Sequence, residues 1–142
     1  MKDGDRVGVL MKKICTFLVA DINKVLKEYD ITKSQMDVLR YITRQEKEVS
    51  QRDIEEFFGI TNPTVSGIVK RLEHKELIHR KNSPTDARIK YIYKTKKADE
   101  LLETLKQIMN EKEKQISRGL TSQEIEQLYD VLNRILKNIN KP

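Results

Sequence analysis

The sequence predicts a mainly α-helical fold with one small β-hairpin. Apolar residues recur at helical spacing through most of the 142 residues, whereas two short runs, 77–81 and 89–94, alternate in the manner of β-strands. The turn-forming residues SPTD lie between these two runs. A chain of this length is long enough to bury a real core, so we expect one domain.

Two helices are predicted in the N-terminal part of the chain. Residues 7–28 carry apolar side chains at helical spacing over about six turns. Thr32 and Gln35 then form a capping box, in which each side chain can pair with the backbone N–H of the other residue. Apolar residues three positions apart continue this second, shorter helix.

A pair of helices joined by a short turn is predicted next. Ser50 and Asp53 resemble an N-terminal cap, and a glycine ends the helix that they open. Residues 59–61 form a three-residue turn. A new helix starts at Asn62-Pro63, with Asn as the cap and Pro at a position that needs no N–H donor.

The helix that starts at Asn62-Pro63 has two different faces. Its apolar face consists of residues at i, i+3, i+4 and i+7, namely Val65, Ile68, Val69 and Leu72. Its other face has small polar residues first and basic residues one turn later, namely Thr64, Ser66, Gly67, Lys70 and Arg71. Small side chains let a helix backbone approach base edges, and the basic residues can reach phosphates or a guanine edge. The pattern favours a DNA-reading helix-turn-helix over an ordinary helical hairpin with a solvated face.

Two further helices follow the strand pattern. A long helix runs from Lys97 to about Ile116 and breaks near Gly119, and Thr121 with Glu124 forms another capping box. The last helix has one apolar face, made of Ile125, Leu128, Leu132, Ile135 and Ile139. Acidic residues on its polar face would be repelled by an anionic lipid surface, so we expect the apolar face to contact another subunit.

The excess positive charge is concentrated in one quarter of the chain. Residues 62–97 contain ten basic and three acidic residues, a net charge of +7, which leaves −1 for the rest of a chain whose net charge is +6. Such a local basic surface is typical of a polyanion binder, although a lysine-rich solvated surface is the alternative.

The order and spacing of these motifs resemble the MarR family of winged-helix transcription regulators. The matching stretches are ITKSQMDVLRYI, ITNPTVSGIVKRLEHKELIHR and SPTDARIKYIYKTKKADELL. The last of these includes the D-x-R motif of the wing, here Asp86 and Arg88, and Thr95, which opens the next helix. The resemblance extends over nearly the whole chain, including the flanking helices at both ends.

The resemblance implies a winged helix-turn-helix DNA-binding region flanked by dimerisation helices. The DNA-binding region would be 31–97, with an N-terminal dimerisation helix in 1–30 and C-terminal dimerisation helices in 98–142, all in one compact unit. The protein would be an obligate homodimer that binds double-stranded DNA at a pseudo-palindromic operator and acts as a repressor.

The resemblance also implies roles for individual residues. Carried over position by position, the residues at the major groove would be Pro63, Thr64, Ser66, Gly67 and Lys70, and Arg71 joins them from the helix pattern. Arg88 would reach from the wing into the minor groove, Asp86 would orient it, and Lys90 follows on the same wing. An exposed ion pair without a role in binding is the alternative for Asp86 and Arg88.

The chain departs from the family at four positions. Glycine is usual where Glu76 and Ala98 stand, and further arginines are common where Ala87 and Ile89 flank Arg88. These departures put the end of the recognition helix and the phosphate contacts of the wing in doubt.

The trigger for such a regulator has two interpretations. Relatives often release DNA when a small amphipathic or aromatic ligand binds between the dimer helices and the DNA-binding lobe. Other relatives sense oxidants through a cysteine in the first helix, where Cys15 stands here, although a buried and inert Cys15 is the alternative.

The function of the whole chain also has an alternative interpretation, a winged-helix module for protein–protein contacts without DNA binding. The polar and basic recognition face argues against it.

Several other classes of protein are not expected. The sequence has no nucleophile–base arrangement, glycine-rich phosphate loop or metal-ligand spacing, so we expect no enzyme activity, no cofactor and no metal site. The apolar runs are too short to span a bilayer. The N-terminus lacks the apolar block of a signal peptide, and a single cysteine fits a reducing compartment, so we expect a cytoplasmic protein.

Overall fold

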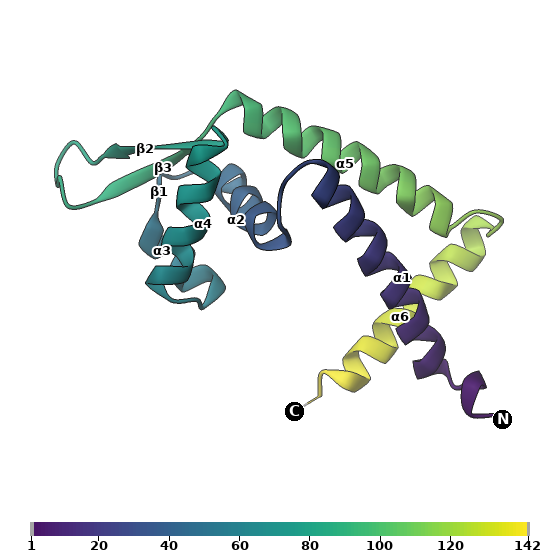
Figure 1. Ribbon diagram of the computed structural model, residues 1–142. Coiled ribbons are helices and arrows are strands. Elements are labelled where there is room, and N and C mark those ends of the chain that lie inside the picture. Colours follow the sequence, from purple (N-terminus) through teal and green to yellow (C-terminus); the bar gives the residue numbers. More distant parts are fainter. Residues whose placement is uncertain (1, 142) are drawn as a thin grey trace. The chain divides into compact units, whose positions relative to one another are not determined.

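The computed structural model describes residues 2–141, apart from the side chain of residue 3. The chain forms two compact units, one ending at Leu101 and the other starting at Leu102 (Figure 1). The first unit contains η1 (Asp3–Asp5), α1 (Val7–Glu28), α2 (Lys33–Arg44), β1 (Val49–Ser50), α3 (Gln51–Phe58), α4 (Asn62–His74), β2 (Ile78–Asn82), β3 (Lys90–Lys94) and the start of α5 (Lys96–Ile116). The second unit contains the rest of α5 and α6 (Ser122–Ile139). The predicted mainly α-helical fold with a small β-hairpin is confirmed.

The sheet has three antiparallel strands in the order β1-β3-β2. Strands β2 and β3 form the predicted hairpin, which starts and ends within one residue of its expected bounds. Strand β1 was not predicted, and it extends the sheet by pairing Val49 with Ile92 of β3. On its other side Ile92 pairs with Arg80 of β2, so β3 is the central strand.

The core of the first unit lies around α4. The predicted apolar face of this helix is buried, with Val65, Val69 and Leu72 fully inaccessible. The helix packs against α2, α3 and β2, which contribute Leu39, Ile54 and other buried residues. Because this face is committed to the core, the polar and basic face of α4 is the one left available to a partner.

The three predicted capping boxes are present. In each capping box the backbone N–H of the third residue donates to the cap hydroxyl, at 3.1 Å for Gln35 to Thr32, 3.2 Å for Asp53 to Ser50 and 3.1 Å for Glu124 to Thr121. The expected cap of α4 was wrong by one residue. Thr61, not Asn62, is the N-cap, and Pro63 is therefore the second helical residue.

Helix α1 leaves most of its apolar residues uncovered. Its buried residues are Val25 and Leu26, close to its C-terminal end. Toward the N-terminus a series of large apolar side chains is exposed, namely Val7, Leu10, Ile14, Phe17 and Val19. Such a stripe is typical of a helix that packs against another chain.

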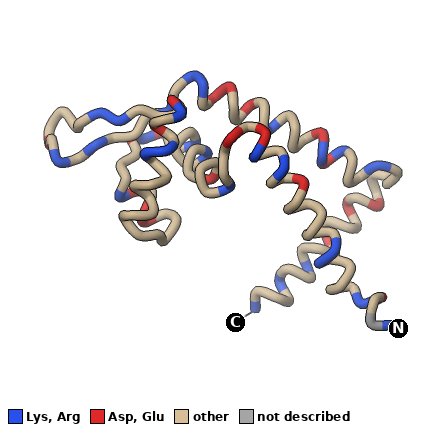
Figure 2. The backbone as a smooth tube through the Cα atoms, in the orientation of Figure 1, with Lys and Arg blue, Asp and Glu red and all other residues tan. Residues whose placement is uncertain are grey.

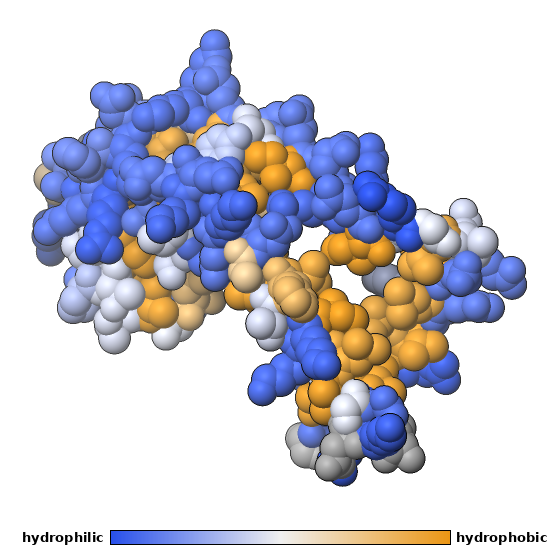
Figure 3. Space-filling model, turned by 45° about the vertical axis from the view of Figure 1, so that its right-hand side comes forward, coloured by the Kyte–Doolittle hydropathy of each residue, from blue (hydrophilic) through white to orange (hydrophobic). Residues whose placement is uncertain are grey.

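Helix α6 of the second unit also has an uncovered apolar stripe. None of its residues, all of which are described, is buried. Its exposed apolar residues are Ile125, Leu128, Tyr129, Val131, Leu132, Leu136 and Ile139. Figure 3 shows many hydrophobic residues, in orange, at the surface of the molecule. None of the helices within residues 2–141 is long and apolar enough to cross a bilayer.

Candidate nucleic-acid interface

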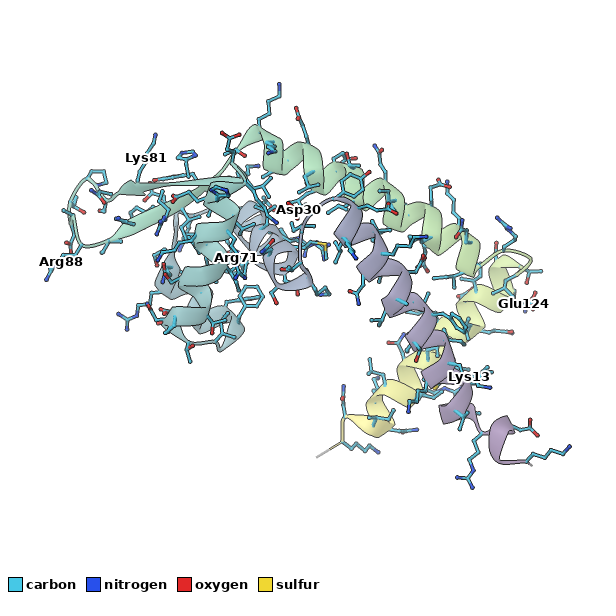
Figure 4. All side chains as sticks on the ribbon, viewed as in Figure 1. Lys13, Asp30, Arg71, Lys81, Arg88 and Glu124 are labelled. Atoms are coloured by element: carbon cyan, nitrogen blue, oxygen red, sulfur yellow. The ribbon has the colours of Figure 1, made fainter. Side chains whose placement is uncertain are left out.

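The open face of α4 carries the residues that the sequence analysis selected. Pro63, Thr64, Lys70 and Arg71 are exposed, whereas Ser66 and Gly67 are half-buried. Figure 4 shows Arg71 on α4. A Cβ atom added at Gly67 would meet nothing within 4 Å, so the packing of the protein itself does not require glycine there.

The first turn of α4 is held by hydroxyl groups. The Oγ1 atoms of Thr61 and Thr64 lie 3.1 Å apart. The backbone N–H of Val65 donates to the carbonyl of Thr61 at 3.1 Å. This arrangement fixes the Thr64 hydroxyl at the N-terminal end of α4.

At the tip of the hairpin, Asp86 holds Arg88 in a fixed direction. The guanidinium donates from Nε to Asp86 Oδ1 at 3.1 Å and from Nη2 to Oδ2 at 3.2 Å. The backbone N–H of Arg88 also donates to Oδ1 at 3.0 Å. The bonds from the Arg88 side chain lower the pKa of the Asp86 carboxyl below its usual range, and the bond from the Arg88 backbone N–H lowers it further. The Arg88 side chain is nevertheless 91% exposed and lies at the outer end of the hairpin (Figure 4).

Ser83 fixes the turn that carries this pair, and the sequence analysis did not single it out. It is buried, and its hydroxyl accepts the backbone N–H groups of Thr85 at 3.3 Å and Asp86 at 3.4 Å. Its own N–H donates to the carbonyl of Ile89 at 2.8 Å, which closes the loop. A serine that opens SPTD is a turn signal, and this signal could have identified the residue.

A second ion pair ties the hairpin to α4. Arg80 of β2 donates to both carboxylate oxygens of Glu73, each at 3.0 Å. This bidentate bond lowers the pKa of Glu73 and raises that of Arg80. This pair was not predicted from the sequence, because its two residues lie on different elements and only the turn between them brings them together.

A basic cavity of about 460 Å³ lies next to the hairpin. Its lining comes from the starts of α3 and α4 and from the hairpin, and consists of Ser50, Gln51, Arg52, Asn62, Arg80, Arg88, Ile89, Lys90 and Ile92. Arg88 and Lys90, both selected from the sequence, therefore share one site with two further arginines. Figure 2 shows Lys and Arg distributed along the hairpin and α4.

Glu76 occupies the turn between α4 and β2 in a left-handed conformation, with φ of 60°. Glycine was expected at this position from the family resemblance, and an L-residue is disfavoured there. The Thr95 hydroxyl donates to the Glu76 carbonyl at 2.8 Å, which helps to hold the turn. Helix α4 still ends normally, with the N–H of Lys75 donating to the carbonyl of Arg71.

Cys15 lies apart from this surface in the sequence, on α1. Its side chain is exposed and it is not in a disulfide. Exposure meets one of the two conditions for a reactive thiol, and a lowered pKa is the other. Among residues 2 and 4–141, no group of three His, Cys, Asp or Glu side chains is placed to hold a metal ion.

Two helices joined by a short turn, the second with its apolar face in the core and its polar face open, followed by a basic hairpin, define a winged helix-turn-helix protein. A family model described as the MarR family matches residues 29–89. The chain is 33% identical to the transcription regulator MarR from Oenococcus oeni PSU-1, over 93% of this chain and 99% of that one, with a TM-score of 0.58. The chain belongs to the MarR family.

Two solved structures of another transcription regulator are also similar. MepR, a transcription regulator of the Staphylococcus aureus multidrug efflux pump MepA, is 29% identical over 95% of this chain and 99% of that one, with a TM-score of 0.83. The S. aureus MepR–DNA complex is 29% identical over 95% of this chain and 98% of that one, with a TM-score of 0.68.

Proposed function

We propose that this protein is a sequence-specific repressor that binds double-stranded DNA as a homodimer. The proposal rests on two features of the first compact unit, the open face of α4 and the exposed side chain of Arg88. The polar face of α4 is open, and the exposed Arg88 is aimed outward by Asp86. A recognition helix suits the major groove, and an inserted arginine suits the negative potential of a narrow minor groove.

The contacts divide into two kinds. Thr64, Ser66 and Gly67 would let the backbone of α4 approach base edges, with Pro63 beside them. Lys70 and Arg71 would bind phosphates or a guanine edge one turn later. The basic cavity that contains Arg88 and Lys90 would receive the phosphate backbone between the two grooves. The similarity to the solved MepR–DNA complex supports DNA binding as such.

The uncovered stripes of α1 and α6 support a homodimer. We assign residues 1–30 and 98–142 to dimerisation and residues 31–97 to DNA binding. The stripes contain many large apolar side chains, and a second copy of the chain would remove them from water. A dimer also places two recognition helices on a pseudo-palindrome, with half-sites roughly one helical turn apart.

We propose two alternative signals for the release of DNA, by analogy with other members of the family. A small amphipathic or aromatic ligand would act if it bound one spacing of the two DNA-binding regions better than the other. Oxidation of Cys15 is the rival trigger, and the exposure of its thiol is what favours it. Thiol titration combined with DNA binding under oxidant separates the two. We propose a cytoplasmic regulator without enzyme activity or a cofactor.

Salt-dependent binding to duplex DNA tests the proposal. The dissociation constant for a labelled duplex is measured over a range of salt concentrations by fluorescence anisotropy. Counterion release predicts that log affinity falls linearly and steeply with log salt concentration. A flat dependence would contradict DNA binding and favour the protein-interaction module.

A further inference from the structure

The side chain of Lys75 connects the end of α4 to the link between α1 and α2. Lys75 directly follows α4, and its Nζ donates to the backbone carbonyl of Asp30 and, at 2.9 Å, to Oε1 of Gln35. Asp30 Oδ2 lies 3.9 Å from the same nitrogen. All three residues belong to the first compact unit. Figure 4 labels Asp30 at the end of α1.

Both acceptors are themselves held in place. Asp30 has a left-handed backbone, with φ of 51°, immediately beyond the end of α1. Gln35 is buried, and its Oε1 also accepts the backbone N–H of Thr32 in the capping box of α2. The ammonium group of Lys75 therefore binds two acceptor atoms that are held in fixed positions at the α1–α2 link.

The same end of α4 is tied to the start of α5. Lys97 Nζ donates to the carbonyl of Lys75 at 2.8 Å, and the Thr95 hydroxyl donates to that of Glu76, also at 2.8 Å. The C-terminal end of α4 is thus connected to the two helices that flank the DNA-binding region. Its N-terminal end carries the residues proposed to meet DNA.

We propose that Lys75 is a positioning residue that sets the direction of α4 relative to α1. The inference rests on the proposed function, because only in a DNA-bound dimer does this direction set the distance between the two recognition helices. Helix α4 has 13 residues and is about 20 Å long. A rotation of about 10° at its Lys75 end moves the other end by about 3.5 Å, roughly the rise of one base pair. Lys75 therefore controls which half-site spacing the dimer accepts.

Lys33 provides a matched control. Lys33 and Lys75 line the same cavity of about 330 Å³, which lies next to the α1–α2 link. Lys33 Nζ pairs with Asp37 on its own helix at 2.8 Å, so its bond connects no separate elements. Replacing either lysine by methionine removes one positive charge and keeps a similar side-chain length.

The test uses the full-length protein and a set of duplex operators that differ only in half-site spacing, by one or two base pairs. Affinities of the wild type, Lys75→Met, Lys33→Met and Lys75→Arg are measured at one salt concentration. We expect Lys75→Met to lower the ratio of the affinity for the best spacing to the affinity for neighbouring spacings by about fivefold or more. Lys33→Met should keep the wild-type profile. Lys75→Arg, which retains the charge and the donors, should restore most of it.

Two controls keep the outcomes distinct. Thermal unfolding and sedimentation show whether each variant is a folded dimer. If Lys75→Met does not fold, Lys75→Gln takes its place with the same expectation, because its shorter amide cannot reach both acceptors. A folded Lys75 variant with the wild-type spacing profile, or with a uniform loss at every spacing, would overturn the positioning role. A wild type that binds none of the duplexes would overturn the proposed function itself.

Discussion

At the residue scale, a single arginine, Arg88, lies at the tip of the hairpin with its side chain 91% exposed. Arg88 is flanked by Ala87 and Ile89, so no further arginine assists it at the tip. Asp86 fixes its direction through bonds from both the side chain and the backbone. A guanidinium that is already oriented loses less conformational entropy when it enters a groove.

Replacing Arg88 by alanine should weaken DNA binding by about 1–3 kcal/mol, because the minor-groove contact is lost. Equilibrium binding to one operator at fixed salt measures the effect. Lys114→Ala is the control, since it removes the same charge from α5 in the other unit, where Lys114 pairs with Glu111. An Arg88→Ala protein with wild-type affinity would contradict the role of the wing tip.

The Asp86 carboxyl should titrate at a lower pH in the wild type than in Arg88→Ala. The bonds from Arg88 lower its pKa in the folded protein, so the variant should show a higher value. A depressed folded pKa contributes stability above the unfolded value of about 3.9, and this contribution is lost as the pH falls through the folded value. Carboxyl NMR titration checks the shift, and equal pKa values of Asp86 in the two proteins would show that the Arg88 side chain does not bind this carboxyl.

At the element scale, α4 has a glycine that its own fold does not require. Gly67 lies on the face opposite the core, and an added Cβ would meet nothing within 4 Å. Glycine within a helix costs roughly 0.5–1 kcal/mol relative to alanine. A residue that lowers stability without a packing reason is consistent with close approach of a ligand.

Replacing Gly67 by alanine should therefore separate stability from binding. We expect the free energy of unfolding to rise by about 0.5–1 kcal/mol, measured by urea denaturation, while DNA affinity falls because the new methyl group meets the DNA. Gly8→Ala on α1 is the control for the change in stability, since its added Cβ also meets nothing within 4 Å. Unchanged DNA affinity of Gly67→Ala would place this part of α4 away from the bases.

The elements that the sequence predicted are those set by local chemistry. The apolar period of α4 and the capping boxes at Thr32, Ser50 and Thr121 depend on residues within one or two turns. Strand β1 was missed because two residues cannot show alternation, and it exists only by pairing with β3. The cap of α4 was placed one residue late because Thr61 and Asn62 are both good caps.

The site was predictable in part for the same reason. Asp86 and Arg88 are two residues apart, so their pairing could be inferred from the motif. The bond of Lys75 to Gln35 joins residues 40 positions apart, and no local pattern indicates it. Glu73 and Arg80 pair across a turn whose geometry depends on the left-handed Glu76.

At the scale of the whole molecule, the apolar stripes of α1 and α6 stay exposed to solvent in a single chain. Large apolar side chains such as Phe17 and Leu136 remain exposed in the isolated chain. Exposed apolar stripes of this kind are typical of an interface with another chain. The proposed dimer would bury it and would also set the geometry of DNA binding.

Deleting the segment after Thr121 should leave a monomer or an unfolded chain, because the stripe of α6 is lost. Leu132→Asp is a milder version that places a charge within the stripe, and Gln127→Asp is its control on the same helix. Analytical ultracentrifugation measures the oligomeric state. A well-folded dimer of the truncated chain would contradict the assignment of 98–142 to dimerisation.

Selection of bound duplexes from a random DNA pool tests the central claim most directly, because it reports binding, symmetry and spacing in one measurement. The account predicts an enriched pseudo-palindrome whose half-sites are centred about 10–10.5 base pairs apart. Selection with Arg88→Ala should retain the major-groove positions and lose any preference in the flanking minor groove. Recovery of no enriched sequence, or of one unpaired half-site, would contradict a dimeric, sequence-specific DNA-binding protein.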